Sequence, residues 1–107
     1  SLVFTDERLR TEIEPFAANT KMRIENLRIA HDMGIQTFVS LEPVWDPQQS
    51  LELIDLTQGF VDLFKVGKLN HHPREREIDW QKFKKDALKK LVDYKKDYYI
   101  KRDLDKY

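Results

Sequence analysis

The sequence of 107 residues contains no cysteine. It therefore has no disulfide, no thiolate nucleophile and no metal site built on cysteine. No apolar run approaches the roughly 20 residues that a membrane-spanning helix needs. The first residues, S-L-V-F-T-D-E, do not have the pattern of a signal peptide. These absences favour a cytoplasmic protein without a membrane partner.

An excess of charge of either sign is also lacking, since Lys+Arg and Asp+Glu both total 19 and the formal net charge is zero. A nucleic-acid-binding domain normally carries a basic excess or a basic patch. The balance of positive and negative charge argues against a basic nucleic-acid-binding surface on this chain, although a larger protein could bind nucleic acid through another part. The length is that of one domain or part of one. Because Ser1 opens directly into a β-prone run, we expect a piece of a longer protein.

The N-terminal third reads as a short strand followed by two helices. Leu2–Thr5 is β-prone, and Thr5-Asp6 caps a helix from Glu7 to Glu14 that Pro15 ends. A loop over 14–18 leads to a cap at Asn19 or Thr20 and a helix over about 21–33, with Gly34 after it. Its apolar positions at helical spacing are Ile24, Leu27, Ala30 and Met33.

The stretch I-Q-T-F-V-S-L-E-P-V, residues 35–44, is the centre of the prediction. We expect a strand from Ile35 to Glu42 with alternating faces. One row is apolar: Ile35, Thr37, Val39 and Leu41. The other becomes polar toward its end: Gln36, Phe38, Ser40 and Glu42. Carboxyl ends of parallel strands are where α/β folds do chemistry.

Two further β/α units follow. Asp46-Pro47 is a strong helix start, and Leu51, Leu53 and Ile54 supply its buried side before Gly59. The next strand is expected over 60–67, with Lys65 on the face of Glu42. A loop over 67–78 precedes a helix capped by Asp79, running to about Lys96, whose apolar side is Trp80, Phe83, Ala87, Leu91 and Tyr94. Residues 98–100 form a closing strand and residues 101–107 a polar tail.

The order β-α-α-β-α-β-α-β predicts a short parallel sheet with right-handed crossovers. We therefore expect an α/β fold, a partial (β/α) barrel fragment over residues 1–107 with its helices on the outer face.

Several motifs resemble those of a known family. The run E-P-F-A-A-N-T-K-M-R-I-E-N-L-R-I-A-H-D-M-G-I is similar to the radical SAM pattern E-P-x-A followed by R-I-x-x-L-x-x-A-x-x-x-G-I. T-F-V-S-L-E-P-V and V-D-L-F-K-V-G-K-L-N, with I-D-W-Q-K-F and D-Y-Y-I-K, resemble the C-terminal half of radical SAM proteins of the spore photoproduct lyase and DNA repair photolyase-like type. The resemblance extends from about Leu2 to Asp103.

This resemblance implies a parent enzyme that uses S-adenosylmethionine and a [4Fe-4S] cluster, held by a C-x-x-x-C-x-x-C loop. The chain departs from the family here, since it has no cysteine. The cluster loop would lie in a missing N-terminal half of the barrel, and this chain alone would hold neither cofactor and be inactive. DNA would be the substrate in the lyase itself. A second partner is another copy of the chain, pairing through the open sheet edge.

The residues that would bind cofactor or substrate are Ser40, Glu42, Lys65, Lys68, Asn70, Arg23 and Thr5. Ser40 and Glu42 lie at a strand end, and Lys68 and Asn70 lie in a following loop. The resemblance implies that Arg23 lies near the methionyl carboxylate and Thr5 near the ribose. The alternative readings are a Glu42–Lys65 ion pair and a solvated Arg23. The adjacent His71 and His72 do not suggest a metal site, because neighbouring side chains point apart.

Two other functions fit the residues. A different (β/α)-barrel enzyme would use Glu42 as an acid or base, or Lys65 as a Schiff-base amine. A self-contained, non-catalytic α/β binding module would cover its own sheet.

Overall fold

The computed structural model describes residues 2–14 and 19–107 as a small α/β domain. Ser1 and the predicted helix stop at Pro15, with the loop through Ala18, lie outside the described residues. The described elements are α1 (Glu7–Ile13), α2 (Thr20–Asp32), β1 (Phe38–Val44), α3 (Pro47–Thr57), β2 (Leu63–Lys68), the 3-10 helix η1 (Pro73–Glu77), α4 (Trp80–Asp93), β3 (Asp97–Ile100) and α5 (Arg102–Asp105).

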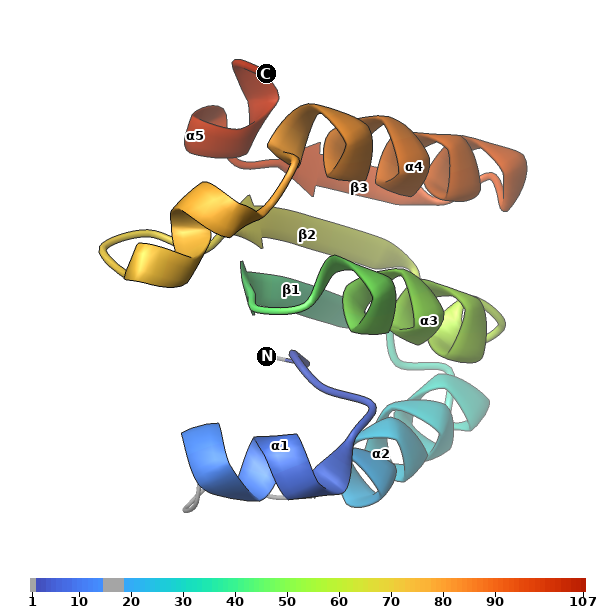
Figure 1. The fold of residues 1–107 in the computed structure, drawn as a ribbon. Helices are drawn as coiled ribbons and strands as arrows, with labels where there is room; N and C mark the ends of the chain where they lie inside the picture. Colours follow the sequence, from blue (N-terminus) through green and yellow to red (C-terminus); the bar gives the residue numbers. More distant parts are fainter. Residues whose placement is uncertain (1, 15–18) are drawn as a thin grey trace.

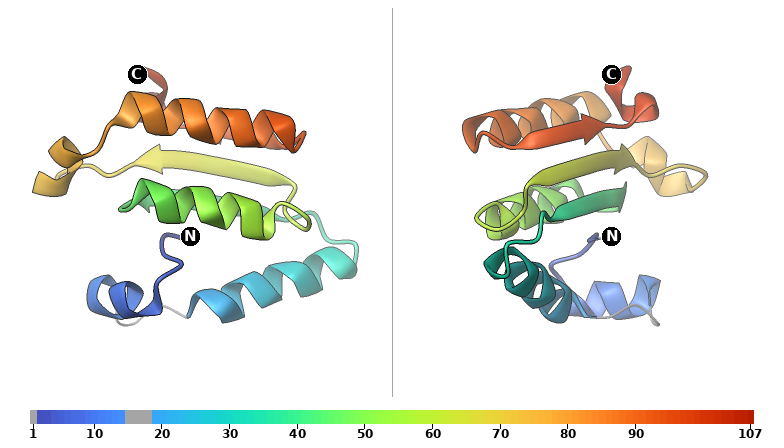
Figure 2. Two further views of the ribbon diagram at one scale, coloured as in Figure 1. Left: turned by 45° about the vertical axis from the view of Figure 1, so that its right-hand side comes forward. Right: turned by 180° about the vertical axis from the view of Figure 1, so that it is seen from behind.

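The three strands form one parallel sheet in the order β1-β2-β3, so neighbours in the sheet are also neighbours in the sequence. Helices α3 and α4 pack side by side on one face of this sheet (Figure 1). Seen from behind, the strands lie in front and these two helices lie behind them (Figure 2). One broad face of the sheet is thus covered and the other is open. None of the helices in the described ranges is long and apolar enough to cross a bilayer.

Helices α1 to α4 begin where the sequence predicts, because a side-chain oxygen caps each of these N-termini. Asp46 accepts from the backbone N–H of Gln48, and Pro47 occupies the first turn of α3. Asp79 accepts from Lys82 N at the start of α4. These contacts satisfy backbone donors that a helix N-terminus leaves without partners.

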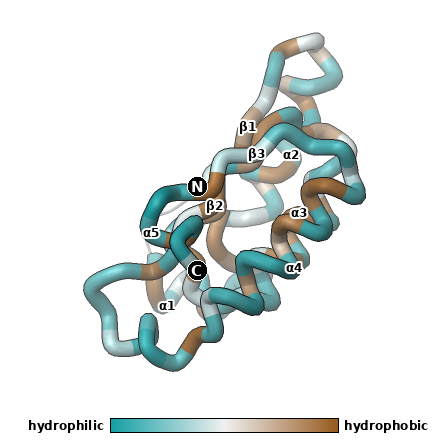
Figure 3. Tube along the Cα trace, turned by 90° about the horizontal axis from the view of Figure 1, so that it is seen from above, coloured by the Kyte–Doolittle hydropathy of each residue, from teal (hydrophilic) through white to brown (hydrophobic). Residues whose placement is uncertain are grey.

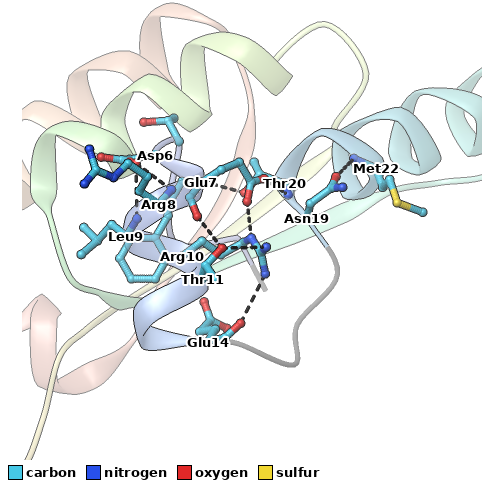
Figure 4. Close-up of polar contacts among 12 residues, drawn as sticks. Asp6, Glu7, Arg8, Leu9, Arg10, Thr11, Glu14, Asn19, Thr20 and Met22 are labelled. Atoms are coloured by element: carbon cyan, nitrogen blue, oxygen red, sulfur yellow. Dashed lines mark hydrogen bonds and ion pairs between the residues drawn. The ribbon is translucent and has the colours of Figure 1, made fainter.

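A carboxylate of α1 joins the first two helices. Glu7 accepts a 2.6 Å hydrogen bond from the backbone N–H of Thr20, at the start of α2, and also binds the guanidinium of Arg10 (Figure 4). The Arg10 hydrogen bond holds the pKa of Glu7 below its usual range. Thr20 in turn donates to the carbonyl of Phe4 at 2.8 Å, which ties α2 to the N-terminal segment.

The predicted strand starts were wrong by about three residues. β1 begins at Phe38 rather than Ile35, because Gly34 has a φ of 81° and Ile35 N donates to Ala30 O, so the helix C-cap still includes Ile35. Ile35 is 52% exposed. β2 begins at Leu63 rather than Phe60, since the Thr37 hydroxyl donates to Phe60 O and Asp62 accepts from Thr37 N. The turn before β2 is thereby fixed.

The two ends of the described chain also differ from the prediction. Leu2, Val3 and Phe4 are buried, but residues 2–5 do not form the predicted strand, and the chain bends at Thr5. Leu2 N donates to Ser40 O at 2.9 Å, beside β1. The predicted polar tail contains α5, which buries Leu104 completely.

The core lies between the sheet and helices α3 and α4, as predicted. Val39, Leu41, Phe64 and Val66 point from the sheet toward Leu53, Ile54, Phe83, Ala87 and Leu91, and all are buried. In the view from above, hydrophobic residues gather on β1, β2 and α3, while the peripheral turns are hydrophilic (Figure 3). Because side chains alternate along a strand, the open face takes the other row of each strand.

Candidate functional site

The open face of the sheet carries a row of polar and aromatic side chains. Ser40 of β1 lies opposite Lys65 of β2, and Lys65 lies opposite Tyr99 of β3. Together with their neighbours they line a shallow hollow of about 520 Å³, the sheet-face hollow, whose lining residues are Phe38, Ser40, Glu42, Leu63, Lys65, Tyr99 and Lys101. The predicted shared face of Ser40, Glu42 and Lys65 is confirmed.

An ion pair crosses the carboxyl end of the sheet. Glu42 Oε1 lies 2.6 Å from Lys101 Nζ, although β2 separates β1, which carries Glu42, from β3, which Lys101 directly follows. The hydrogen bond that Lys101 donates to Glu42 raises the pKa of Lys101. The ion pair between Glu42 and Lys65 that the sequence suggested does not form, because Lys101 takes that place.

Gly67 of β2 makes this crossing feasible. A Cβ placed at position 67 would overlap the Glu42 carboxylate and would lie 3.2 Å from Lys101 Cδ. The glycine therefore provides the space in which a carboxylate from one strand meets an ammonium two strands away.

Lys65 has a different environment from Lys101. Its ammonium lies 4.7 Å from the centroid of the Phe38 ring, a cation–π distance. It makes no ion pair with an acidic residue in the ranges 2–14 and 19–107. Lys65 thus presents a positive charge in the hollow that an anionic group could contact.

A second hollow adjoins the first at the edge of β1. Arg23, Asn26, Leu27 and Ala30 of α2 line it together with Leu2, Val39 and the shared residues Phe38 and Ser40. Arg23 is half-buried. The structure therefore brings Arg23 to the border of the same surface that holds Ser40, Glu42 and Lys65.

Lys68 and Asn70 lie elsewhere. Lys68 is the last residue of β2, not a loop residue, and it is on the core-facing row with only 4% exposure. Its ammonium binds Glu75 and donates to Asn70 Oδ1 at 3.1 Å, 5.3 Å from the centroid of the Trp80 ring. The Lys68 hydrogen bond lowers the pKa of Glu75. Asn70 also donates to Asp103.

Thr5 is the third candidate that is not on the open face. Its hydroxyl donates to Glu52 at 3.0 Å and its backbone N–H donates to Gln49, so it joins the N-terminal segment to α3. His72 also has a structural contact, since its Nδ1 accepts from Arg74 N and its ring packs edge-on against Trp45.

The site residues expected from the sequence do not include Gly67, Tyr99 and Lys101, which are part of this surface. Tyr99 and Lys101 are two residues apart in Y-Y-I-K, so strand alternation beyond the closing strand would have placed both on the face of Lys65. No pattern in the sequence shows that residue 67 must be small.

No family description, no curated protein and no solved structure matches this chain.

Proposed function

We propose that this chain is the C-terminal part of a radical SAM enzyme that resembles spore photoproduct lyase and its DNA repair photolyase-like relatives. Its open sheet face would form one wall of the site for S-adenosylmethionine and substrate. The observation that carries the proposal is the sheet-face hollow, where Ser40, Glu42 and Lys65 project together from the uncovered face. The sequence motifs that prompted the proposal lie on the same strands.

The sheet topology supports an arc of a (β/α) barrel. The strands follow one another in sequence order, and the helices between them, α3 and α4, pack on the same face. In a barrel the helices form an outer layer and the inner face receives side chains from every strand. A doubly wound sheet would need helices on both faces. The uncovered face would then be the barrel interior, completed by polypeptide outside this chain.

The charged, polar and aromatic groups of the hollow match the groups of S-adenosylmethionine. The ligand carries an ammonium, a sulfonium, a carboxylate, ribose hydroxyls and an adenine ring. Glu42 pairs with Lys101 through Oε1 and has a second carboxylate oxygen for the cationic groups, while Lys65 supplies an ammonium for the carboxylate. Ser40 can exchange hydrogen bonds with a hydroxyl, and Phe38 and Tyr99 offer exposed rings to a base.

The cluster does not fit this chain. It has no cysteine, and no group of three or more His, Asp or Glu residues suited to a metal occurs within the described ranges. In the proposed parent, S-adenosylmethionine with a reduced cluster supplies hydrogen-abstracting radical chemistry. The residues of this chain would orient the ligand and line the cavity, and hold no iron.

The test uses the intact parent protein. We expect a C-x-x-x-C-x-x-C loop in the coding sequence upstream of Ser1. We also expect 5′-deoxyadenosine after anaerobic reconstitution with iron and sulfide, addition of S-adenosylmethionine and reduction. A parent without the cysteine loop, or without 5′-deoxyadenosine formation when the cluster is loaded, would refute the proposal.

A further inference from the structure

Helix α2 has an exposed apolar row on its outer side. Met22, Ile29 and Met33 are 57%, 49% and 71% exposed. Residues seven and four apart lie along one side of a helix, so these side chains form a single stripe. α2 lies at the periphery of the molecule, beyond the edge of β1 (Figure 2). The opposite side of α2 carries Ile24 and Leu27, which pack against the core.

A charged row runs beside the apolar one. Its residues are four, three and four apart and alternate in sign: Lys21, Glu25, Arg28 and Asp32. All are exposed. Glu25 and Arg28 already pair within the helix. Lys21 and Asp32, at the ends of the row, form no ion pair with any other residue that the structure describes.

The charges of this row are complementary to those of the same row running in the opposite direction. When a second copy of α2 lies antiparallel across the first, Lys21 faces Asp32, and Glu25 faces Arg28. A parallel copy would instead place like charges opposite each other. A two-fold axis perpendicular to the plane of both helices brings the same flank of each helix together, so each of the two pairings occurs twice in the dimer.

The apolar row also fits an antiparallel pair of α2 helices. Reversal about the point between residues 27 and 28 places Met22 against Met33 of the other copy. The charged row reverses about the point between residues 26 and 27. The two centres differ by one residue, which displaces the partner helix by two residues, about 3 Å along its axis, and long side chains can absorb this offset. One antiparallel register therefore serves both rows.

We propose that the exposed side of α2 is a self-association surface, on which a second copy of this chain binds antiparallel through Met22, Ile29 and Met33 with flanking Lys21–Asp32 ion pairs. The surface is separate from the sheet-face hollow, and the proposal does not depend on the radical SAM assignment. A helix of 13 residues buries less than the roughly 800 Å² per partner of a standard interface. We therefore expect a weak, reversible dimer with a Kd of about 10–100 μM.

Sedimentation equilibrium of the chain between about 10 μM and 1 mM spans this range. The variant I29K should weaken association at least tenfold by placing a charge at the centre of the apolar row. D32K and K21D should each weaken it about fivefold, because each sets like charges opposite one another. An equimolar mixture of D32K and K21D should recover the wild-type Kd, since each copy then supplies the charge that the other lacks. K85D, the same charge change at an exposed position of α4, should leave it unchanged.

A chain that stays monomeric up to 1 mM would overturn the proposal. So would a dimer that I29K leaves intact while a variant on the outer edge of β3 removes it, which would mean pairing of sheet edges. Failure of the D32K and K21D mixture to recover association, with both variants folded by circular dichroism, would contradict the antiparallel register.

Discussion

Glu42 and Lys101 lie 2.6 Å apart across a strand that belongs to neither of them. The contact exists because β2 has a glycine, Gly67, at the crossing point. The Glu42 carboxylate and the Lys101 ammonium thereby connect the carboxyl ends of β1 and β3 across β2, where Gly67 has no side chain to block them. This arrangement sets the shape of the sheet-face hollow at the end where α/β folds hold ligands.

Replacement of Gly67 by alanine should break this arrangement. The new methyl group would occupy the position of the Glu42 carboxylate, which lies at the end of a flexible, partly exposed side chain and would have to move away from Lys101; loss of such an ion pair should cost up to about 1 kcal/mol in the free energy of unfolding. Urea unfolding would measure the loss, and the pKa of Lys101 should fall toward its ordinary value of 10.5, as seen by NMR titration.

Gly59→Ala is the matched control for Gly67→Ala. A Cβ at position 59 would have no atom within 4 Å. Alanine there should leave stability unchanged or raise it by up to about 1 kcal/mol, because it restricts the unfolded chain. Equal destabilisation by both substitutions would contradict the role given to Gly67.

The packing of α3 against α4 should depend on Asp55. Its carboxylate accepts from Tyr94 Oη at 2.7 Å and from Lys90 Nζ at 2.9 Å. Burial opposes ionisation, but these two hydrogen bonds outweigh it and lower the pKa of Asp55. Asp55→Asn should lower the free energy of unfolding by about 0.5–1 kcal/mol, a small value because the site is partly exposed.

The pH dependence of the stability difference between wild type and Asp55→Asn follows from the directions in which the pKa values of Asp55 and Tyr94 are shifted. The contribution of Asp55 is present above its ordinary pKa of 3.8 and is lost as the pH falls through the lower folded value. The pKa of Tyr94 is raised by its hydrogen bond to Asp55, so its contribution is present below 10.0 and is lost as the pH rises through the higher folded value. The difference between wild type and Asp55→Asn should be constant between these limits and shrink outside them.

Loss of Glu75 and loss of Lys68 should destabilise the fold to different extents. Its ammonium is almost fully buried and is neutralised by Glu75. Among the residues that the structure describes, Glu75→Ala leaves the buried charge with Asn70 as its one polar partner, whereas Lys68→Met removes the charge and keeps the packing against Trp80. Thermal unfolding should show a larger drop in midpoint for Glu75→Ala than for Lys68→Met. The reverse order would mean that an unpaired Glu75 carboxylate costs more than an unpaired Lys68 ammonium, which would contradict this account.

Much of the fold could be predicted from local chemistry. Asp46-Pro47 and Asp79 are caps whose effect is confined to one turn, and the apolar side of α4 repeats at the helical period. These signals located α3 and α4 correctly. The strand starts were misplaced because Ile35 has a high strand propensity, while the turn at Gly34 and the Thr37–Asp62 contact, 25 residues apart, decide where β1 and β2 begin.

The site was only partly predictable for a related reason. Alternation along one strand placed Ser40 and Glu42 together, and parallel pairing added Lys65. The identity of the partner of Glu42 depends on which side chain at the end of β3 reaches across Gly67, and no spacing in the sequence encodes that. Lys68 was assigned to a loop because the end of β2 could not be told from the sequence. Lys68 is buried by its tertiary contacts with Glu75 and Trp80, which a local sequence pattern does not reveal.

The most direct measurement is formation of 5′-deoxyadenosine from S-adenosylmethionine by the anaerobically reconstituted parent, compared between wild type and Glu42→Gln. The substitution removes the charge that we assign to the cationic groups of the ligand and keeps the side-chain shape. We expect the KM for S-adenosylmethionine to rise at least about tenfold, the change that corresponds to a charge-assisted hydrogen bond of roughly 1.4 kcal/mol or more. Glu12→Gln, an exposed position on α1, should behave as wild type. Formation of 5′-deoxyadenosine with an unchanged KM in Glu42→Gln would contradict the assignment of the open sheet face to the ligand site.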